Sequence, residues 1–146
     1  MQKKQTKKQR KSNIDQAIEM VNDVVKLRIA PSEVHGVGVF ALRNIRKGEK
    51  VYATALPNML DIPFKKFKKI HPEIVELILE RFPRVAENSH FLCPDTLMQM
   101  YMNHSEKPNY NAFTDKATKR IKKGDEVFED YRAIPDWEKL FPWIKT

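Results

Sequence analysis

Three short segments of this sequence carry residues that could bind a ligand or take part in chemistry. The first is His35-Gly36-Val37-Gly38, in which two glycines one residue apart would let a ligand approach the backbone closely. It does not predict a dinucleotide site, because no third glycine opens a helix. Taken singly, this motif is typical of an ordinary tight turn.

The second segment is centred on Asn103 and His104, which precede Ser105. Adjacent amide and imidazole groups offer donors and acceptors within one turn, and such a pair could hold a polar ligand by an amine and a purine edge. The alternative is a capped turn in which the asparagine satisfies local backbone groups. The four histidines and the single cysteine lie at no metal-ligand spacing, so we predict no metal site.

The third segment is Asp130-Tyr131, at the end of a predicted strand. In a strand of period two, Val127, Glu129 and Tyr131 share one face. Glu129 and Tyr131 are therefore expected to be neighbours in one site, although a half-buried aromatic is the usual role of a strand tyrosine. Glu129 could attract a cationic peptide or face solvent, and the solvent-facing position is slightly favoured.

Two helical regions and several short strands are predicted to position these segments. Ser12 and Asp15 resemble a capping box and are followed by apolar residues at helical spacing, which predicts a helix over 13–24. Residues 62–84 carry two apolar stripes at helical spacing and are interpreted as a helical insertion. The aromatic end, 136–143, is expected to form a short helix or lid.

Alternating or β-rich runs predict the strands. They cover residues 25–29, which stop at Pro31, and residues 37–42, 50–54, 117–121 and 126–131. Residues 122–125 lie between the last two runs, and the sequence Lys-Lys-Gly-Asp favours a hairpin there. The pattern therefore predicts many short strands with one helical insert.

Length and composition limit the class of protein. The chain has 146 residues, 41% hydrophobic and 32% charged, which predicts one domain and excludes wholesale disorder. No apolar run reaches the roughly 18 residues that cross a bilayer, and the N-terminus lacks the apolar segment of a secretory signal. A single cysteine, Cys93, cannot form an intramolecular disulfide, so an intracellular location is expected, cytoplasmic or, in a eukaryotic host, nuclear.

The net charge of +8 is concentrated at the N-terminus. Six basic residues and no acidic one lie within 1–11, which leaves 8 − 6 = +2 for the rest of the chain. We expect this tail to be disordered, either as a solubilising extension or as a weak contact for nucleic-acid phosphates. The body is expected to lack a clustered basic-aromatic surface.

Taken together and in this order, the motifs resemble the SET domain of protein-lysine methyltransferases. The N-terminal match covers 36–41 and 44–49, and the C-terminal match covers 103–105, 108–109, 121–126 and 130–131. The resemblance extends over about residues 25 to 131, with the helical stretch in the place of the family's variable insert. Each motif alone is modestly specific, but five in the right order are not expected by chance.

The resemblance implies a mainly β fold, the SET-domain β-clip, in which small curved sheets surround a C-terminal pseudoknot. It divides the chain into a basic tail (1–12), an N-terminal helix (13–24), the SET domain (25–134, with 62–84 as the insert) and an aromatic lid (135–146). If that holds, the Asn-His motif and Tyr131 meet in space although they are far apart in sequence.

The resemblance further implies transfer of a methyl group from S-adenosylmethionine to a lysine amine of a protein substrate, such as a histone or another basic protein. Cofactor contacts are then expected from the loop at His35, Gly36, Val37 and Gly38, from Asn103 and His104, and from Tyr131. Tyr131 would be the catalytic residue. Substrate contacts are expected from Tyr101, Glu129, Trp137 and Phe141. Neither a metal nor a membrane is implied.

The sequence also departs from the family pattern. Glu106 stands where the family often has cysteine, Met100 where an arginine is common, and the cysteine-rich zinc segments of many members are missing. The chain thus resembles the compact zinc-free members of viruses and bacteria. At least one of Trp137, Phe141 and Trp143 is expected to cover the adenine or wall the lysine channel, the alternative being simple anchoring of the C-terminus.

Two other interpretations stay open. One is a non-catalytic SET-like module that binds a peptide, with the basic tail gripping nucleic acid. The other ignores the resemblance and describes a small basic RNA-binding protein. Its weakness is the expected absence of a basic-aromatic surface on the body.

Overall fold

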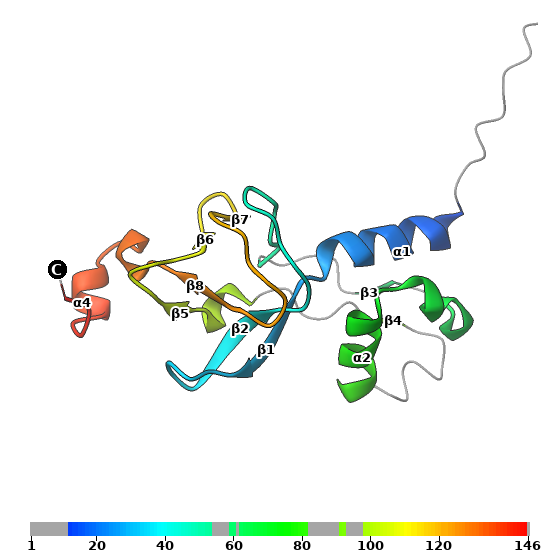
Figure 1. Ribbon diagram of the computed structural model, residues 1–146, viewed down its shortest axis with the longest axis horizontal. Helices are drawn as coiled ribbons and strands as arrows, with labels where there is room; N and C mark the ends of the chain where they lie inside the picture. Colours follow the sequence, from blue (N-terminus) through cyan, green and yellow to red (C-terminus); the bar gives the residue numbers. More distant parts are fainter. Residues whose placement is uncertain (1–11, 54–58, 61, 82–90, 93–97, 146) are drawn as a thin grey trace, which may run out of the picture. The chain divides into compact units, whose positions relative to one another are not determined.

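The computed structural model describes residues 12–53, 59–60, 62–81, 91–92 and 98–145 (Figure 1). The chain divides into two compact units. The first comprises Met1–Asp23 and Met59–Leu92, and the second comprises Val24–Asn58 and Cys93–Thr146. The expected basic tail lies outside the described residues except for Ser12. The domain boundaries expected from the resemblance stay predictions.

The second unit is built on a four-stranded sheet. Its strands are β1 (Leu27–Pro31), β2 (Val37–Ala41), β5 (Asn103–His104) and β8 (Glu126–Glu129), in the order β1-β2-β8-β5. β1 and β2 form an antiparallel hairpin whose register runs from Leu27 opposite Ala41 to Pro31 opposite Val37. Because β1 is an edge strand, Pro31 can end it without losing a ladder hydrogen bond.

Strand β8 is held on both sides by segments that are distant in sequence. It pairs antiparallel with β2 and parallel with β5. Beyond β5, the side-chain amide of Asn109 donates to the Glu126 carbonyl at 2.9 Å and accepts from the Phe128 N–H at 2.8 Å. This union of the last strand with residues 103–109 is the C-terminal crossing that the resemblance implies.

A second small sheet completes the core of this unit. β6 (Tyr110–Asn111) pairs with β7 (Lys116–Ala117), and the turn between them carries Asp115 at φ +55°. The buried Asp115 carboxylate accepts the N–H groups of Tyr52 and Ala53 and the Tyr110 hydroxyl. The apolar core that surrounds these strands consists of Leu27, Val39, Ala41, Ile45, Val51, Ala53, Met98, Met102, Tyr110, Ala117, Ile121 and Val127.

The first unit is mainly helical, as predicted. Helix α1 (Asn13–Val24) begins after Ser12, whose hydroxyl accepts the Asp15 N–H at 3.1 Å. The predicted insertion, 62–84, contains the 3₁₀ helix η1 (Phe64–Lys69) and helix α2 (Pro72–Arg81). The short strands β3 (Met59–Leu60) and β4 (Phe91–Leu92), which pair with each other, flank it in sequence. No described helix is long and apolar enough to cross a membrane.

Three expectations about the strands are wrong. Residues 117–121 and 126–131 form no hairpin, because β7 pairs with β6 and Ile121 instead bridges to Ile45. Within the described part of 50–54, only Lys50 makes a bridge, and Tyr52 at φ +60° interrupts the extended backbone. Tyr131 is not on a strand, because β8 ends at Glu129 and Tyr131 begins the 3₁₀ helix η3 (Tyr131–Ala133).

Because Tyr110 is buried, its ionisation is expected to lower the free energy of unfolding at alkaline pH. Burial, together with the hydrogen bond to Asp115, raises the pKa of Tyr110 above its usual range. Its stabilising contribution is therefore complete below the unfolded pKa of about 10 and is lost as pH rises through the folded pKa. We expect Tyr110→Phe to flatten the alkaline fall in the free energy of unfolding.

The same variant leaves the buried Asp115 short of one donor, so we also expect it to lose about 1–3 kcal/mol at neutral pH. Urea denaturation between neutral pH and pH 11 measures both effects. Tyr101→Phe, which changes an exposed tyrosine of the same unit, is the control. An unaltered alkaline slope in Tyr110→Phe would contradict the assignment.

Candidate functional site

A pocket of about 750 Å³ lies within the second unit. Its walls come from the β1–β2 loop at residues 34–37, from residues 100–104, and from Tyr131, Phe141 and Trp143. Its size falls within the range of small-molecule sites in proteins. The structure thus brings the Gly-x-Gly loop, the Asn-His motif and Tyr131 to one place, although they lie far apart in sequence.

The loop that forms one wall is fixed by Ser32. The Ser32 hydroxyl accepts the N–H of Val34 at 3.0 Å and that of His35 at 3.4 Å, and the Ser32 N–H donates to the Gly36 carbonyl. Gly36 has φ +48°, a conformation that favours glycine. The loop is exposed, but its backbone is not free to rearrange while these bonds persist.

The Glu126 carboxylate, on β8, binds the side chain of Ser32 and so fixes this loop. Glu126 accepts the Ser32 hydroxyl at 2.8 and 2.9 Å through its two oxygens, and accepts the Asn103 amide at 2.9 Å. A Cβ on Gly38 would lie 2.1 Å from the Glu126 Oε1 atom. Gly38 is therefore required for space, because a larger residue would displace the carboxylate from Ser32 and Asn103.

Asn103 connects this carboxylate to the loop backbone. Its amide nitrogen also donates to the carbonyls of His35 and Val37, each at 3.1 Å, so its two N–H groups are shared among three acceptors. Asn103 is 7% exposed. Its nitrogen therefore positions the loop, in addition to any contact that Asn103 makes with a ligand.

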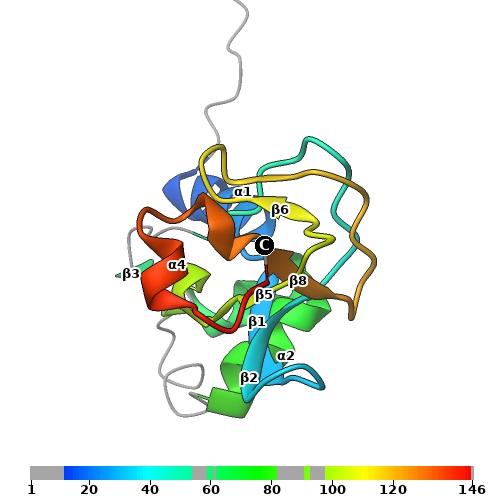
Figure 2. The ribbon, with the colours of Figure 1, turned by 90° about the vertical axis from the view of Figure 1, so that its left-hand side faces the viewer.

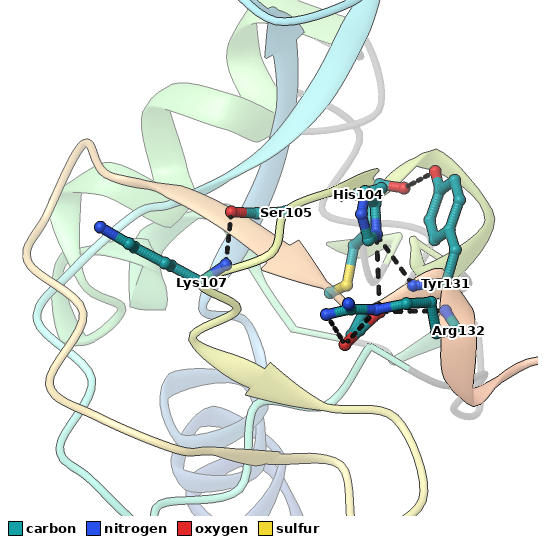
Figure 3. A network of polar contacts seen from close by, with 7 residues as sticks. His104, Ser105, Lys107, Tyr131 and Arg132 are labelled. Atoms are coloured by element: carbon teal, nitrogen blue, oxygen red, sulfur yellow. Dashed lines mark hydrogen bonds and ion pairs between the residues drawn. The ribbon is translucent and has the colours of Figure 1, made fainter. Parts of the chain in front are cut away.

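His104 and Tyr131 meet at the opposite wall (Figure 3). The Tyr131 N–H donates to Nδ1 of His104 at 3.0 Å, so a neutral ring carries its proton on Nε2. The Asp130 carboxylate lies 3.7 Å from the same Nδ1. Asp130 instead accepts the Arg132 N–H and side chain, and this hydrogen bonding holds its pKa below the usual range.

The Tyr131 side chain points back at the segment that carries the Asn-His motif. Its hydroxyl donates to the Met102 carbonyl, as Figure 3 shows. Burial, and secondarily the negative charge of Glu129, raise the pKa of Tyr131 above its ordinary value. The phenol therefore keeps its proton at neutral pH and cannot act as a phenolate base there.

Aromatic rings from the C-terminus complete the pocket. After helix α4 (Trp137–Leu140), Phe141 lies 4.6 Å from Tyr131 and Trp143 lies 5.8 Å from His104, measured between ring centroids. Figure 2, which faces the end with α4, shows the C-terminal segment passing near β5. Trp143 is 61% exposed and Ile144 is buried, so the segment is anchored beside an open aromatic edge.

The expected substrate residues do not all reach the pocket. Tyr101 and Phe141 line it, with Tyr101 exposed. Trp137 is not among the described residues that line it. Glu129 is 6% exposed, so the favoured solvent-facing position is wrong; burial raises its pKa, an effect that a hydrogen bond with Gln99 opposes.

Sequence reasoning missed Ser32, Glu126 and the Met102 carbonyl. Glu126 is an ordinary acidic strand residue in the sequence, and Ser32 lies 94 positions away from it. The one available signal was Gly38, since a glycine inside a strand often marks the close approach of another group. Nothing in the sequence indicated which group that would be.

No group of three or more potential metal ligands of the His, Cys, Asp and Glu types gathers among the described residues. Cys93 lies outside them. The compact zinc-free subtype stays a prediction.

Comparison with known proteins identifies the family. A family model described as "SET domain" matches residues 36–132, about two thirds of the chain. The chain therefore belongs to the SET-domain family, which contains the protein-lysine methyltransferases. No curated protein sequence matches it.

Solved structures also match this chain, at low identity and with low TM-scores. A Plasmodium falciparum protein assigned as a histone methyltransferase is 23% identical over 73% of this chain and 92% of that chain, with a TM-score of 0.38. A humanized mutant of Chaetomium thermophilum Polycomb Repressive Complex 2, bound to an inhibitor, is 18% identical over 78% of this chain, with a TM-score of 0.37. This protein spans 16% of the length of that chain.

A further neighbour is the Chaetomium complex in an autoinhibited conformation bound to S-adenosylmethionine. It is 21% identical over 81% of this chain and 16% of that chain, with a TM-score of 0.36. These likenesses concern the fold alone.

The hydrogen bonds of Glu126 with Ser32 and Asn103 predict that this carboxylate stabilises the conformation of the β1–β2 loop. In Glu126→Gln, one oxygen can still accept from both Ser32 and Asn103, but the charge and the second acceptor of the Ser32 hydroxyl are lost, so the remaining hydrogen bonds are weaker. We expect amide hydrogen exchange at residues 34–37 to become about tenfold faster, which corresponds to about 1.4 kcal/mol. Mass spectrometry of exchange measures it.

The matched control is Glu106→Gln, which neutralises an exposed carboxylate of the same unit. Exchange in the loop should stay at the wild-type rate in this control. Unchanged loop exchange in Glu126→Gln would show that the carboxylate does not hold the loop.

Proposed function

We propose that this protein is a protein-lysine N-methyltransferase that uses S-adenosylmethionine. The observation that carries the proposal is the convergence of the Gly-x-Gly loop, Asn103, His104 and the Tyr131 phenol on one pocket. Membership of the SET-domain family supports it. The substrate is a lysine-bearing protein, such as a histone or another basic protein.

The described residues fit an adenosyl cofactor. An added Cβ on Gly36 would meet nothing within 4 Å, so this backbone is open to a ligand. His104 and Trp143 offer ring faces and edges against which a purine can pack. His35, Gly36, Val37, Asn103 and His104 would hold the cofactor, which when bound supplies an activated methyl group on a sulfonium.

The protein's own part is to present a neutral amine in the right orientation. Deprotonating a free lysine at pH 7 requires roughly 4–5 kcal/mol. An apolar channel favours the neutral amine by withholding water from the charged form. The aromatic side chains of Tyr101, Tyr131 and Phe141 supply such walls in the pocket.

Tyr131 would orient this amine. Its proton is committed to the Met102 carbonyl, which leaves the phenol oxygen free to accept an N–H from the substrate. An amine held by its N–H directs its lone pair away from the phenol. Because the pKa of Tyr131 is raised, the residue positions the amine without removing its proton.

The first test is Tyr131→Phe. Removal of the hydroxyl takes away the acceptor for the amine and leaves the ring contacts, so we expect the rate of methyl transfer to fall by about 100-fold or more. Cofactor affinity, measured by calorimetry, should change little. Tyr52→Phe, in the same unit but outside the pocket lining, should remain active. Near-wild-type turnover of Tyr131→Phe would refute the positioning role.

The second test is Asn103→Ala. Loss of the Asn103 amide leaves the carbonyls of His35 and Val37 without this donor and removes a donor from Glu126. Because the loop is then held less firmly, we expect the affinity for S-adenosylmethionine to fall about tenfold. Asn111→Ala is the control, because Asn111 serves only the β6–β7 turn in its hydrogen bonds to Phe113 and Thr114. Equal affinities of Asn103→Ala and wild type in calorimetry would remove Asn103 from the cofactor site.

A second candidate function is a non-catalytic SET-like module that binds a peptide. The observation that favours it is that the Asn103 nitrogen and the Tyr131 hydroxyl both donate to backbone carbonyls of the protein itself. These donors are therefore already occupied and do not point to a cofactor. Transfer of a labelled methyl group from S-adenosylmethionine to a peptide array distinguishes the two functions. Labelled lysine supports the enzyme, whereas peptide binding without label supports the module.

A further inference from the structure

Two segments of the second unit that are far apart in sequence lie side by side and expose basic side chains. Residues 45–50 follow β2, and residues 116–123 begin at β7. Antiparallel bridges join Ile45 to Ile121 and Lys50 to Lys116. Ile45 and Ile121 are fully buried, which anchors both segments in the core. These two segments therefore bring basic residues together on the body, with no aromatic residue among them.

The exposed cations of these two segments form what we term the basic surface. They are Arg46, Lys47, Lys50, Lys116, Lys119, Arg120, Lys122 and Lys123. The acidic residues within 45–50 and 116–125 are Glu49 and Asp125, which gives 8 − 2 = +6 for this part of the chain. With +6 in residues 1–11 and +8 in total, everything else carries 8 − 6 − 6 = −4. The charge of the body is thus strongly segregated.

The two acidic residues offset only part of this positive charge. The Glu49 carboxylate accepts the Arg46 N–H at 2.8 Å and pairs with the buried Lys26 at 3.1 Å. The Asp125 carboxylate accepts the Lys122 N–H at 3.1 Å. Both carboxylates thus serve the turns of their own segments.

We propose that the basic surface binds the phosphate backbone of double-stranded nucleic acid. Two neighbouring segments that expose eight ammonium and guanidinium groups offer several cations to successive phosphates. The eight residues 116–123 span at most about 26 Å, the length of about eight base-pair steps. The surface reads no sequence, because it offers charge rather than a shaped element for a groove.

The composition of the surface disfavours a protein partner. Stable protein interfaces have an apolar or aromatic centre. Among the described residues of these two segments and the β6–β7 turn, the large exposed apolar side chain is Phe113, which precedes β7. None of the eight basic residues lines the pocket. The surface is therefore a separate site from the one proposed for methyl transfer.

The test uses the full chain and a fluorescent DNA duplex of about 20 base pairs. In the triple variant Lys47→Gln, Lys119→Gln and Lys122→Gln, we expect affinity near 0.1 M salt to fall by about tenfold or more. The slope of log K against log salt should become shallower by about 2–3 units. Fluorescence anisotropy across salt concentrations measures both quantities.

A matched variant separates this surface from total charge. Lys65→Gln, Lys68→Gln and Lys107→Gln removes three exposed lysines elsewhere and leaves the N-terminal tail unchanged. It should bind the duplex as the wild type does. Equal losses in the two variants, wild-type binding by the first variant, or no binding by the wild type would each overturn the proposal. Tighter binding of polyglutamate than of the duplex would also overturn it, in favour of an acidic protein.

Discussion

The Glu126 carboxylate is the interaction on which the candidate site depends. It lies on β8 and bonds to Ser32 in the β1–β2 loop and to Asn103 on β5. A half-buried carboxylate with several donors is held much more firmly than one exposed ion pair would be. Through Ser32 and Asn103 this one group fixes both the amides and the carbonyls of the loop. Gly38 leaves it the space to do so.

The last strand also determines the opposite wall of the pocket. β8 pairs with β5 and so places His104 beside the segment that follows the strand. Asp130 then caps η3 through the Arg132 N–H and turns the chain, so that the Tyr131 N–H meets His104 and its hydroxyl meets Met102. Both walls therefore share one strand, and a change in its register would displace them together.

The pocket and the basic surface differ in how their polar groups are bonded. The pocket gathers polar groups whose bonds are satisfied within the protein, which makes them well positioned but leaves few free donors. The basic surface gathers cations that are exposed to solvent. Both arise because the segments before and after β2 lie against segments from the second half of the chain. The fold thus brings together functional groups that lie between 23 and 94 residues apart in sequence.

The sequence by itself determined the local elements and the family. Helix α1 follows from the Ser12 cap and a 3.6-residue apolar repeat, and the motifs around Gly36, Asn103 and Tyr131 indicated the SET domain. Only the tertiary structure decided the strand partners, the burial of Glu129, the role of Glu126 and the basic surface. The reason is physical: capping and periodicity act within a few residues, whereas two-residue strands have no local preference strong enough to choose among distant partners.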